Sequence, residues 1–171
     1  MAKSYVISDT HWGHSKCWEV FKRSDGSPLR PFSSTEEMDE TMVANWNSVV
    51  EDGDRVYHLG DVVINRKALW ILSRLKGRKV LVKGNHDIFK LKDYTPYFDD
   101  IRSCVVGKTH KGNQYIMTHI PIHPNQLQGR WVLNIHGHLH ANIIDDSRYL
   151  NVSVEQINYT PKDLNDIIKD I

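Results

Sequence analysis

Short apolar runs that lead directly into polar, ligand-type residues recur along this chain, and this pairing constrains its fold more than any other feature. The runs are "YVIS" (5–8), "DRVYHLGD" (54–61), "KVLV" (79–82) and "WVLNI" (131–135). Runs of this length are typical of buried strands. Because α/β proteins place their sites at the ends of strands, we expect an α/β protein whose functional site gathers loops from several strands.

The rest of the pattern predicts strand and helix alternation early in the chain and more strands late. Ser34 and Glu37 have the form of a capping box, and Met38, Met42 and Trp46 follow at helical spacing, which predicts an amphipathic helix with these side chains in the core. Further elements are predicted by periodicity and turn residues. They are a helix over 66–75, strands over 101–106, 114–119 and 148–154, and a short last helix capped by Thr160-Pro161.

Composition narrows the class of protein. The 171 residues fit one domain, which we place at 1–171, and 22 basic against 21 acidic residues leave a net charge of +1 with no basic block. An extended nucleic-acid surface is therefore not expected. Cys17 and Cys104 match no zinc or redox spacing, and the sequence shows neither a signal-peptide core nor an apolar run of membrane-spanning length. These features favour a cytoplasmic protein without a membrane partner. Ten histidines point to metal chemistry or proton transfer.

The order of the polar clusters along the chain is more informative than any one of them. They are Asp9-Thr10-His11, Gly60-Asp61, Gly84-Asn85-His86-Asp87, Thr118-His119 and Gly137-His138-Leu139-His140. Singly, most could be turns or surface side chains. In this order they match D-x-H, G-D, G-N-H-D/E, H and G-H-x-H, and the chain resembles the calcineurin-like metallophosphoesterase family. The stretches "SDTHWGH", "RPF" and "EEMDE" are similar to a small single-domain bacterial and phage subgroup.

The resemblance implies a fold and a metal centre. The fold is a four-layer αββα sandwich of two mixed β-sheets flanked by helices. One divalent metal would be held by Asp9, His11 and His140, and a second by Asn85, His119 and His138. Asp61 would bridge the two ions, whose mutual repulsion at ~3.5–4 Å requires a shared carboxylate. Nitrogen and oxygen ligands without a thiolate favour manganese, iron, nickel, cobalt or zinc over a sulfur-seeking ion. Ligand type does not decide among these metals; manganese is the one expected, with the other four as alternatives.

The resemblance also implies a reaction. A hydroxide bridging the two metals would attack the phosphorus of a phosphate ester, while His86 is expected to hydrogen-bond the phosphate or to protonate the leaving oxygen. The chain departs from the pattern of protein phosphatases, which carry a second aspartate where "GDVVINR" has Ile64. That aspartate pairs with the catalytic histidine, so the partner of His86 is open, with Asp87 as a candidate. The departure counts against a serine/threonine protein phosphatase.

Three side chains are candidates for substrate binding: His14, Arg30 and His123. Arg30 would clamp phosphate oxygens with its guanidinium; the alternatives are an ordinary surface arginine and, for the two histidines, exposed loop positions. Trp12 either stacks on the substrate or packs against its loop. His136 lies outside the G-H-x-H motif, and we expect it to have a structural or supporting role.

The predicted substrate is a small phosphate ester, favoured as a phosphodiester, a class that includes nucleotide-derived esters. A phosphomonoesterase, a nuclease and a non-catalytic scaffold of the same fold are the alternatives. The scaffold is the weakest of these, because all seven ligand positions and His86 are filled.

Overall fold

The strands of the computed structural model, which describes residues 2–171, form two mixed sheets. The first sheet has the order β4 (Asp100–Arg102), β3 (Arg78–Val82), β2 (Arg55–His58), β1 (Ser4–Ile7) and β9 (Lys162–Asp163). Strands β1 to β4 are parallel, and β9 is antiparallel to β1. The second sheet has the order β5 (Val105–Lys108), β6 (Gln114–Met117), β7 (Leu133–His136) and β8 (Tyr149–Asn151). Its first pair is antiparallel and the others are parallel.

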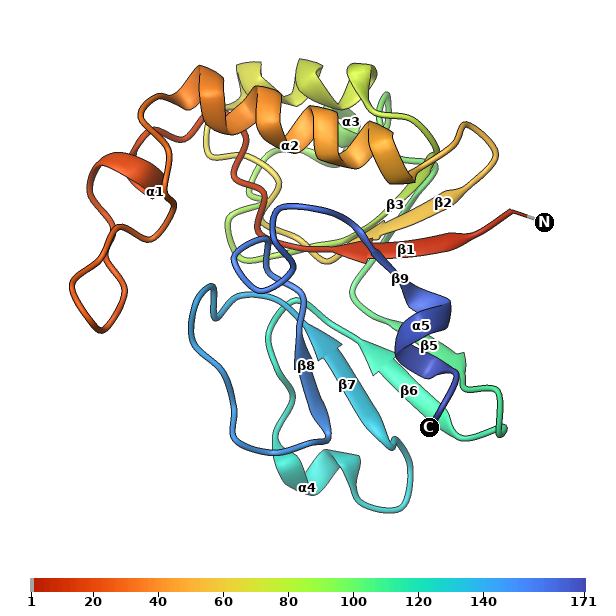
Figure 1. Ribbon diagram of the computed structural model, residues 1–171. Helices are drawn as coiled ribbons and strands as arrows, with labels where there is room; N and C mark the ends of the chain where they lie inside the picture. Colours follow the sequence, from red (N-terminus) through yellow and green to blue (C-terminus); the bar gives the residue numbers. More distant parts are fainter. Residues whose placement is uncertain (1) are drawn as a thin grey trace.

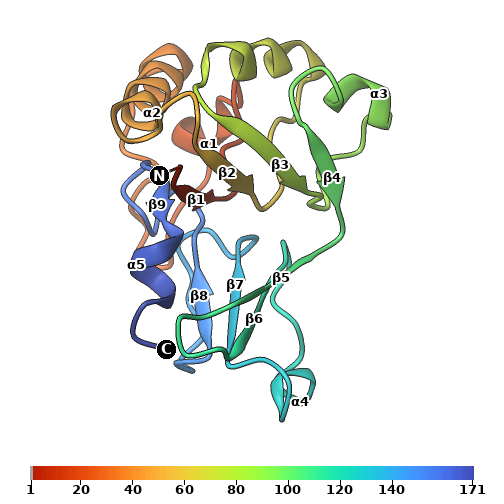
Figure 2. The same cartoon turned by 90° about the vertical axis from the view of Figure 1, so that its right-hand side faces the viewer.

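The helices flank these sheets. Helix α2 (Thr35–Val49) and the 3-10 helix η1 (Arg66–Arg74) cover the face of the first sheet that points away from the second sheet (Figure 1). Four short helices complete the structure: α1 (Lys16–Glu19), α3 (Leu91–Tyr94), α4 (Pro124–Leu127) and α5 (Leu164–Ile168). Figure 2 shows the two sheets one above the other, with α4 at the end of the second sheet that lies farthest from the first. No helix within residues 2–171 has both the length and the apolar character needed to cross a membrane.

Two hydrophobic cores hold these layers together, and alternation along β1 shows how. Tyr5 and Ile7 pack into the core beneath the helices, which also contains Met38 and Trp46, whereas Val6 faces the other way into the core between the sheets. Successive side chains of a strand point to opposite faces. Both faces of the first sheet are therefore buried, which explains why its strands read as continuous apolar runs.

The predicted architecture is confirmed, with three local corrections. The predicted strand 101–106 is divided between two sheets: β4 extends the first and β5 begins the second, so the chain crosses between the layers at residues 103–104. The predicted helix 66–75 is a 3-10 helix. The last helix is capped by Asp163, not by Thr160-Pro161, because residues 162–163 first pair with β1. Ser34 caps α2 as predicted and accepts the Glu37 backbone N–H at 3.0 Å.

The two sheets meet at the carboxyl ends of their parallel strands. The backbone N–H of Ser8, just after β1, donates to the Val152 carbonyl at 3.0 Å, and the N–H of Val154 donates to the Ser8 carbonyl at 3.1 Å. This bridge joins the first sheet to the segment that follows β8. The loops after β1, β2, β3, β6, β7 and β8 therefore emerge in one region, where the predicted ligands lie.

Candidate metal centre

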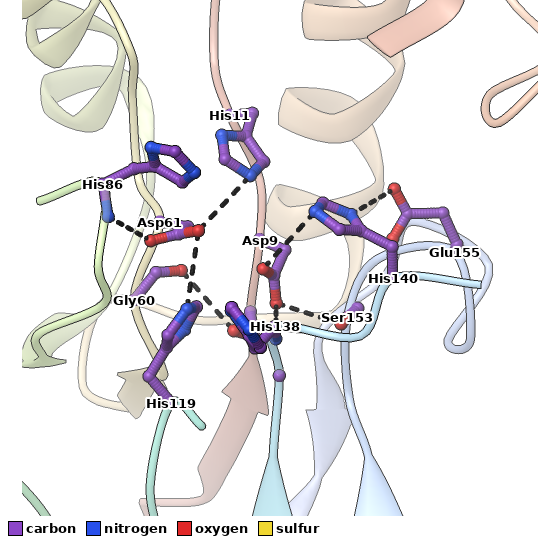
Figure 3. A network of polar contacts seen from close by, with 12 residues as sticks. Asp9, His11, Gly60, Asp61, His86, His119, His138, His140, Ser153 and Glu155 are labelled. Atoms are coloured by element: carbon purple, nitrogen blue, oxygen red, sulfur yellow. Dashed lines mark hydrogen bonds and ion pairs between the residues drawn. The ribbon is translucent and has the colours of Figure 1, made fainter. Parts of the chain in front are cut away.

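The predicted ligands converge in two adjoining groups (Figure 3). Within each group, one ligand atom from every residue lies within 4.8 Å of the others; the groups are Asp9, His11 and His140, and Asp61, His119 and His138. Asn85 belongs with the second group, because its Oδ1 lies 2.8 Å from His119 Nε2 and 2.9 Å from His138 Nδ1. The division matches the one that the family resemblance implied.

Asp61 lies between the two groups. Its Oδ2 is 3.6 Å from His11 Nε2 of one group and 3.4 Å from His119 Nε2 of the other, while its Oδ1 accepts the His86 backbone N–H at 2.8 Å. Burial alone would raise the pKa of Asp61, but the contact with His119 and the His86 N–H outweigh it and lower the pKa to about 2. The carboxylate is thus ionised and positioned as a shared ligand would be.

The orientation of His119 fits a cation. Its Nδ1 lies 2.7 Å from the Leu59 carbonyl, which can only accept, so this nitrogen carries the hydrogen and Nε2 of the neutral ring carries a lone pair. Nε2 faces the oxygens of Asn85 and Asp61. Burial alone would lower the pKa of His119, but the contact with Asp61 outweighs it and raises the pKa, so in the metal-free protein a proton on Nε2 takes the place that a metal ion would take on the neutral ring. A set of acceptors turned toward one another is unfavourable until a positive charge lies between them, which makes the donor set suitable for a divalent ion.

His140 is fixed in a corresponding way by Glu155. Its Nδ1 lies 3.1 Å from Glu155 Oε1, so its Nε2 turns toward Asp9 Oδ1 at 3.8 Å. The Glu155 side chain is fully buried and also accepts from Arg30 Nε at 2.8 Å. Burial alone would raise the pKa of Glu155, but Arg30 and His140 lower it to about 2. A charged carboxylate therefore orients one ligand of the first group.

Asp9 completes the first group. Its Oδ2 accepts from the His138 backbone N–H at 2.8 Å and from Ser153 Oγ at 2.9 Å. Its Oδ1 is buried and has no hydrogen-bond partner among the described residues. A buried carboxylate oxygen without a partner is costly, and this one is directed at the space shared with His140, where a metal ion would satisfy it.

The backbone at the site is strained. Seven non-glycine residues in the part of the chain that the structure describes have positive φ, and five of them are candidate ligands: Asp9, His11, Asp61, His138 and His140. This left-handed conformation is uncommon outside glycine. Strain of this kind concentrates at functional sites, where the surrounding structure enforces it.

The motif glycines allow the loops to approach one another. A Cβ on Gly137 would lie 2.2 Å from Asp9 Oδ2, and one on Gly84 would lie 2.3 Å from Asp61 Oδ1. Neither position has room for a side chain. The glycines of G-N-H-D and G-H-x-H are therefore needed because a ligand carboxylate occupies the space where a side chain would be.

His86 lies at the mouth of the site and is exposed, with its ring centroid 5.7 Å from that of His11. Asp87 does not orient it. The Asp87 carboxylate is buried and accepts the backbone N–H groups of Gly84, Asp61 and Val62 at 2.8–3.0 Å. The prediction that Asp87 is the partner of His86 is therefore wrong: Asp87 connects the loop after β3 to the loop after β2.

An open cavity of about 640 Å³ adjoins the centre. It is lined by His86, by three of the candidate ligands and by His14, which was a candidate for substrate binding. His123 does not line it: this residue caps α4, where its Nδ1 accepts the Asn125 N–H. Trp12 is fully buried and therefore packs against its loop.

Both interpretations of Arg30, as a phosphate clamp and as a surface arginine, are wrong. Its side chain is neither at the surface nor available to clamp a phosphate, because the guanidinium is completely buried. Besides its bond to Glu155, it donates to the Thr10 carbonyl at 2.7 Å and to the Asp9 carbonyl at 2.5 Å. Arg30 thus holds the backbone of the first ligand loop and the carboxylate that orients His140.

Three supporting residues were missed by sequence reasoning: His58, Ser153 and Glu155. His58 is completely buried; its Nε2 lies 2.9 Å from Thr10 Oγ1, and its Nδ1 accepts the Gly60 N–H. Only its place in "YHLGD" hinted at a role. His136, expected to be structural, is buried outside both ligand groups, with Nδ1 2.8 Å from the Gly137 carbonyl.

Two mixed sheets with flanking helices carry two candidate ligand groups with Asp61 between them, an arrangement that fits a metal-dependent phosphoesterase. The sequence model of the calcineurin-like phosphoesterase family matches residues 2–170, and the chain belongs to this family. An uncharacterised protein of Methanocaldococcus jannaschii is 38% identical over 99% of this chain and 91% of its own length. The gene 66 protein of Mycobacterium phage L5 is 35% identical over 51% of this chain and 41% of its own length.

Two solved structures have folds similar to that of this chain. A protein of unknown function from Aquifex aeolicus superimposes over the whole of both chains with a TM-score of 0.77 and 28% identity. The phosphopantetheinyl hydrolase of Mycobacterium tuberculosis superimposes over 92% of this chain and 91% of its own, with a TM-score of 0.50 and 12% identity. The second likeness concerns the fold alone.

Proposed function

We infer that this protein is a two-metal phosphodiesterase that cleaves a small phosphodiester, with manganese as its metal. The observation that carries this inference is the position of Asp61, whose one carboxylate oxygen faces histidine nitrogens of both ligand groups at 3.4 and 3.6 Å. Asp9, His11 and His140 would hold one ion, and Asn85, His119 and His138 the other. When bound, the two ions supply an activated water and neutralise charge on the phosphate.

The chain's own residues prepare the site for this chemistry. Leu59 and Glu155 fix the rings of His119 and His140 so that a lone pair of each faces the centre. The exposed imidazole of His86 stands beside the centre, held through its backbone N–H by Asp61. In this position it donates a proton to the ester oxygen that leaves.

Two features support a diester substrate. Arg30, the arginine most suited by its motif to grip the three free oxygens of a monoester, is buried and fully used by Glu155 and two carbonyls. The cavity is also open to solvent, which gives a second ester substituent room beside the centre. Both features favour a phosphate that carries two substituents.

The test compares a diester with a monoester that share one chromogenic leaving group. The full-length protein with added Mn²⁺ is assayed on bis-p-nitrophenyl phosphate and on p-nitrophenyl phosphate. We expect kcat/KM for the diester to exceed that for the monoester at least tenfold. A higher value for the monoester would make the protein a phosphatase. If neither ester is hydrolysed although two metal ions are bound, the protein is a non-catalytic scaffold of the same fold.

A further inference from the structure

A short projecting segment forms one wall of the cavity beside the metal centre. Residues 20–29, called the arm here, follow α1 and extend away from both sheets (Figure 1). We propose that the arm is a subsite for the group esterified to the phosphate. It selects a group that contains an aromatic ring like that of a nucleobase and that carries a second anionic group elsewhere. This inference rests on the proposed function and names the substrate class of that site.

The arm is a built element with a defined conformation. The Leu29 N–H donates to the Phe21 carbonyl and the Arg23 N–H donates to the Ser27 carbonyl, both at 2.8 Å, and Lys22 pairs with Pro28 as an antiparallel bridge. These bonds close a small hairpin. Its side chains are consequently presented to the cavity from a fixed backbone.

Phe21 gives the arm its aromatic surface. Phe21 is 43% exposed and lines the cavity, so its side chain is accessible to a group bound there. Its centroid lies 5.9 Å from that of His14, which in turn lies 6.0 Å from the ring of His11. A row of rings thus leads from the first ligand group outward to the arm, along the path that a substituent on the phosphate would take.

The charge of this wall is positive. Lys22 and Arg23 line the cavity, and none of the residues that line it is acidic. Arg23 also donates to the Leu29 carbonyl at 3.2 Å, which holds its guanidinium against the arm. The nearby Asp25 carboxylate is engaged at the tip of the arm by the N–H and hydroxyl of Ser27. A second anionic group on the substrate therefore meets two cations beyond the metal centre.

Size and chemistry together favour a nucleotide-like ester. A volume of about 640 Å³ lies within the range of small-molecule sites. An aliphatic substituent could cover Phe21 but would not stack on its ring, and a neutral one would gain little from Lys22 and Arg23. Stacking of a base on an aromatic side chain changes affinity by roughly fivefold to a hundredfold when that side chain is replaced by alanine.

The experiment measures binding without turnover. The full-length protein with Mn²⁺ is titrated calorimetrically with AMP and with ribose 5-phosphate, which has the same sugar and phosphate but no base. We expect AMP to bind at least fivefold more tightly. Phe21→Ala should weaken AMP alone, and Phe21→Tyr should retain the preference. Val20→Ala is the matched control, because Val20 is an exposed apolar neighbour that does not line the cavity.

A second titration addresses the charge. Adenosine carrying phosphates at both the 3′ and 5′ positions should bind more tightly than AMP, and Lys22→Ala should reduce that advantage while leaving AMP nearly unchanged.

Equal binding of AMP and ribose 5-phosphate, or equal weakening of both by Phe21→Ala, would overturn the inference. Either result in a protein that still cleaves the chromogenic diester refutes the subsite alone. A base preference in a protein that cleaves neither chromogenic ester refutes the proposed reaction alone.

Discussion

Glu155→Gln tests whether a buried charge outside the ligand set controls the metal centre. In the structure a single oxygen, Oε1, accepts from both His140 Nδ1 and Arg30 Nε, whereas Oε2 is buried without a partner among the described residues. Glutamine has the same shape and keeps an oxygen in the first position. The substitution therefore removes the charge and preserves both hydrogen bonds, which separates the two contributions.

The expected magnitudes follow from this geometry. Hydrogen bonds to a charged group contribute about 1.5–3 kcal/mol and neutral ones about 0.5–1.5 kcal/mol, so converting two bonds should lower the free energy of unfolding by about 2–3 kcal/mol. Glu155→Ala, which removes from the buried Arg30 both its counter-charge and the hydrogen-bond acceptor that glutamine would keep, should cost about 3–5 kcal/mol. Because a partner of a ligand histidine typically tunes metal affinity, Glu155→Gln should weaken binding of one of two Mn²⁺ ions by about 10–100-fold.

Two measurements check the prediction. Urea unfolding of the metal-free protein gives stability, and calorimetric titration with Mn²⁺ gives the affinity of each ion. Glu51→Gln is the control, because Glu51 is exposed and its ion pair with Lys76 at 3.6 Å should contribute little. If Glu155→Gln lowers stability but binds both ions as the unsubstituted protein does, the carboxylate is structural, and the reasoning about His140 is refuted.

Four further outcomes are expected. Asp61→Asn should bind fewer than two Mn²⁺ per chain and lose at least about 100-fold in kcat/KM, since the ions lose their shared charge; retained activity would contradict the bridging role. Burial lowers the pKa of His58 from 6.5 to about 3, so the unfolded state takes up the proton first. The metal-free protein should therefore lose stability as pH falls from 6.5 toward 3, by up to about 1.4 kcal/mol per pH unit. His58→Gln should flatten that slope in urea unfolding, and an unchanged slope would refute the assignment. Burial raises the pKa of Cys17 to about 11, so a thiol reagent at pH 8 should modify the other, exposed cysteine first; simultaneous modification would contradict this. In Gly137→Ala the new Cβ would overlap a ligand carboxylate at 2.2 Å, so metal content should fall, whereas Gly53→Ala, which meets no atom within 4 Å, should keep it.

Much of the site was predictable because every candidate ligand lies in the loop that follows a strand. Asp9 and Asp61 follow the parallel strands β1 and β2 of the first sheet, and His119 follows β6 of the second sheet, whose carboxyl end meets theirs where the two sheets join. The local pattern of a short apolar run followed by a ligand type is visible without knowledge of the tertiary structure. The grouping of ligands came from the family resemblance, and the separations within each group agree with it.

The sequence-based predictions were wrong where a local pattern is compatible with two different structures. The segment 101–106 has strand character throughout, but nothing in its apolar pattern states that β4 pairs with β3 while β5 pairs with β6. That choice depends on which neighbouring edge is free. Similarly, the motif around Arg30 indicated an arginine needed near the site without indicating its direction. Its partner Glu155 lies 125 positions away, so their pairing exists only in the folded chain.

The strained ligand loops show why these long-range contacts matter. Five candidate ligands have positive φ, and each such residue costs of order 1–3 kcal/mol, which isolated loops would relieve by changing conformation. Several contacts oppose that change: Arg30 holds the carbonyls of Asp9 and Thr10, and Asp87 holds the loop after β2. The two sheets thus impose the ligand geometry through buried polar groups that are not ligands themselves. It follows that substitutions at these supporting positions should alter metal affinity even though no ligand atom is removed.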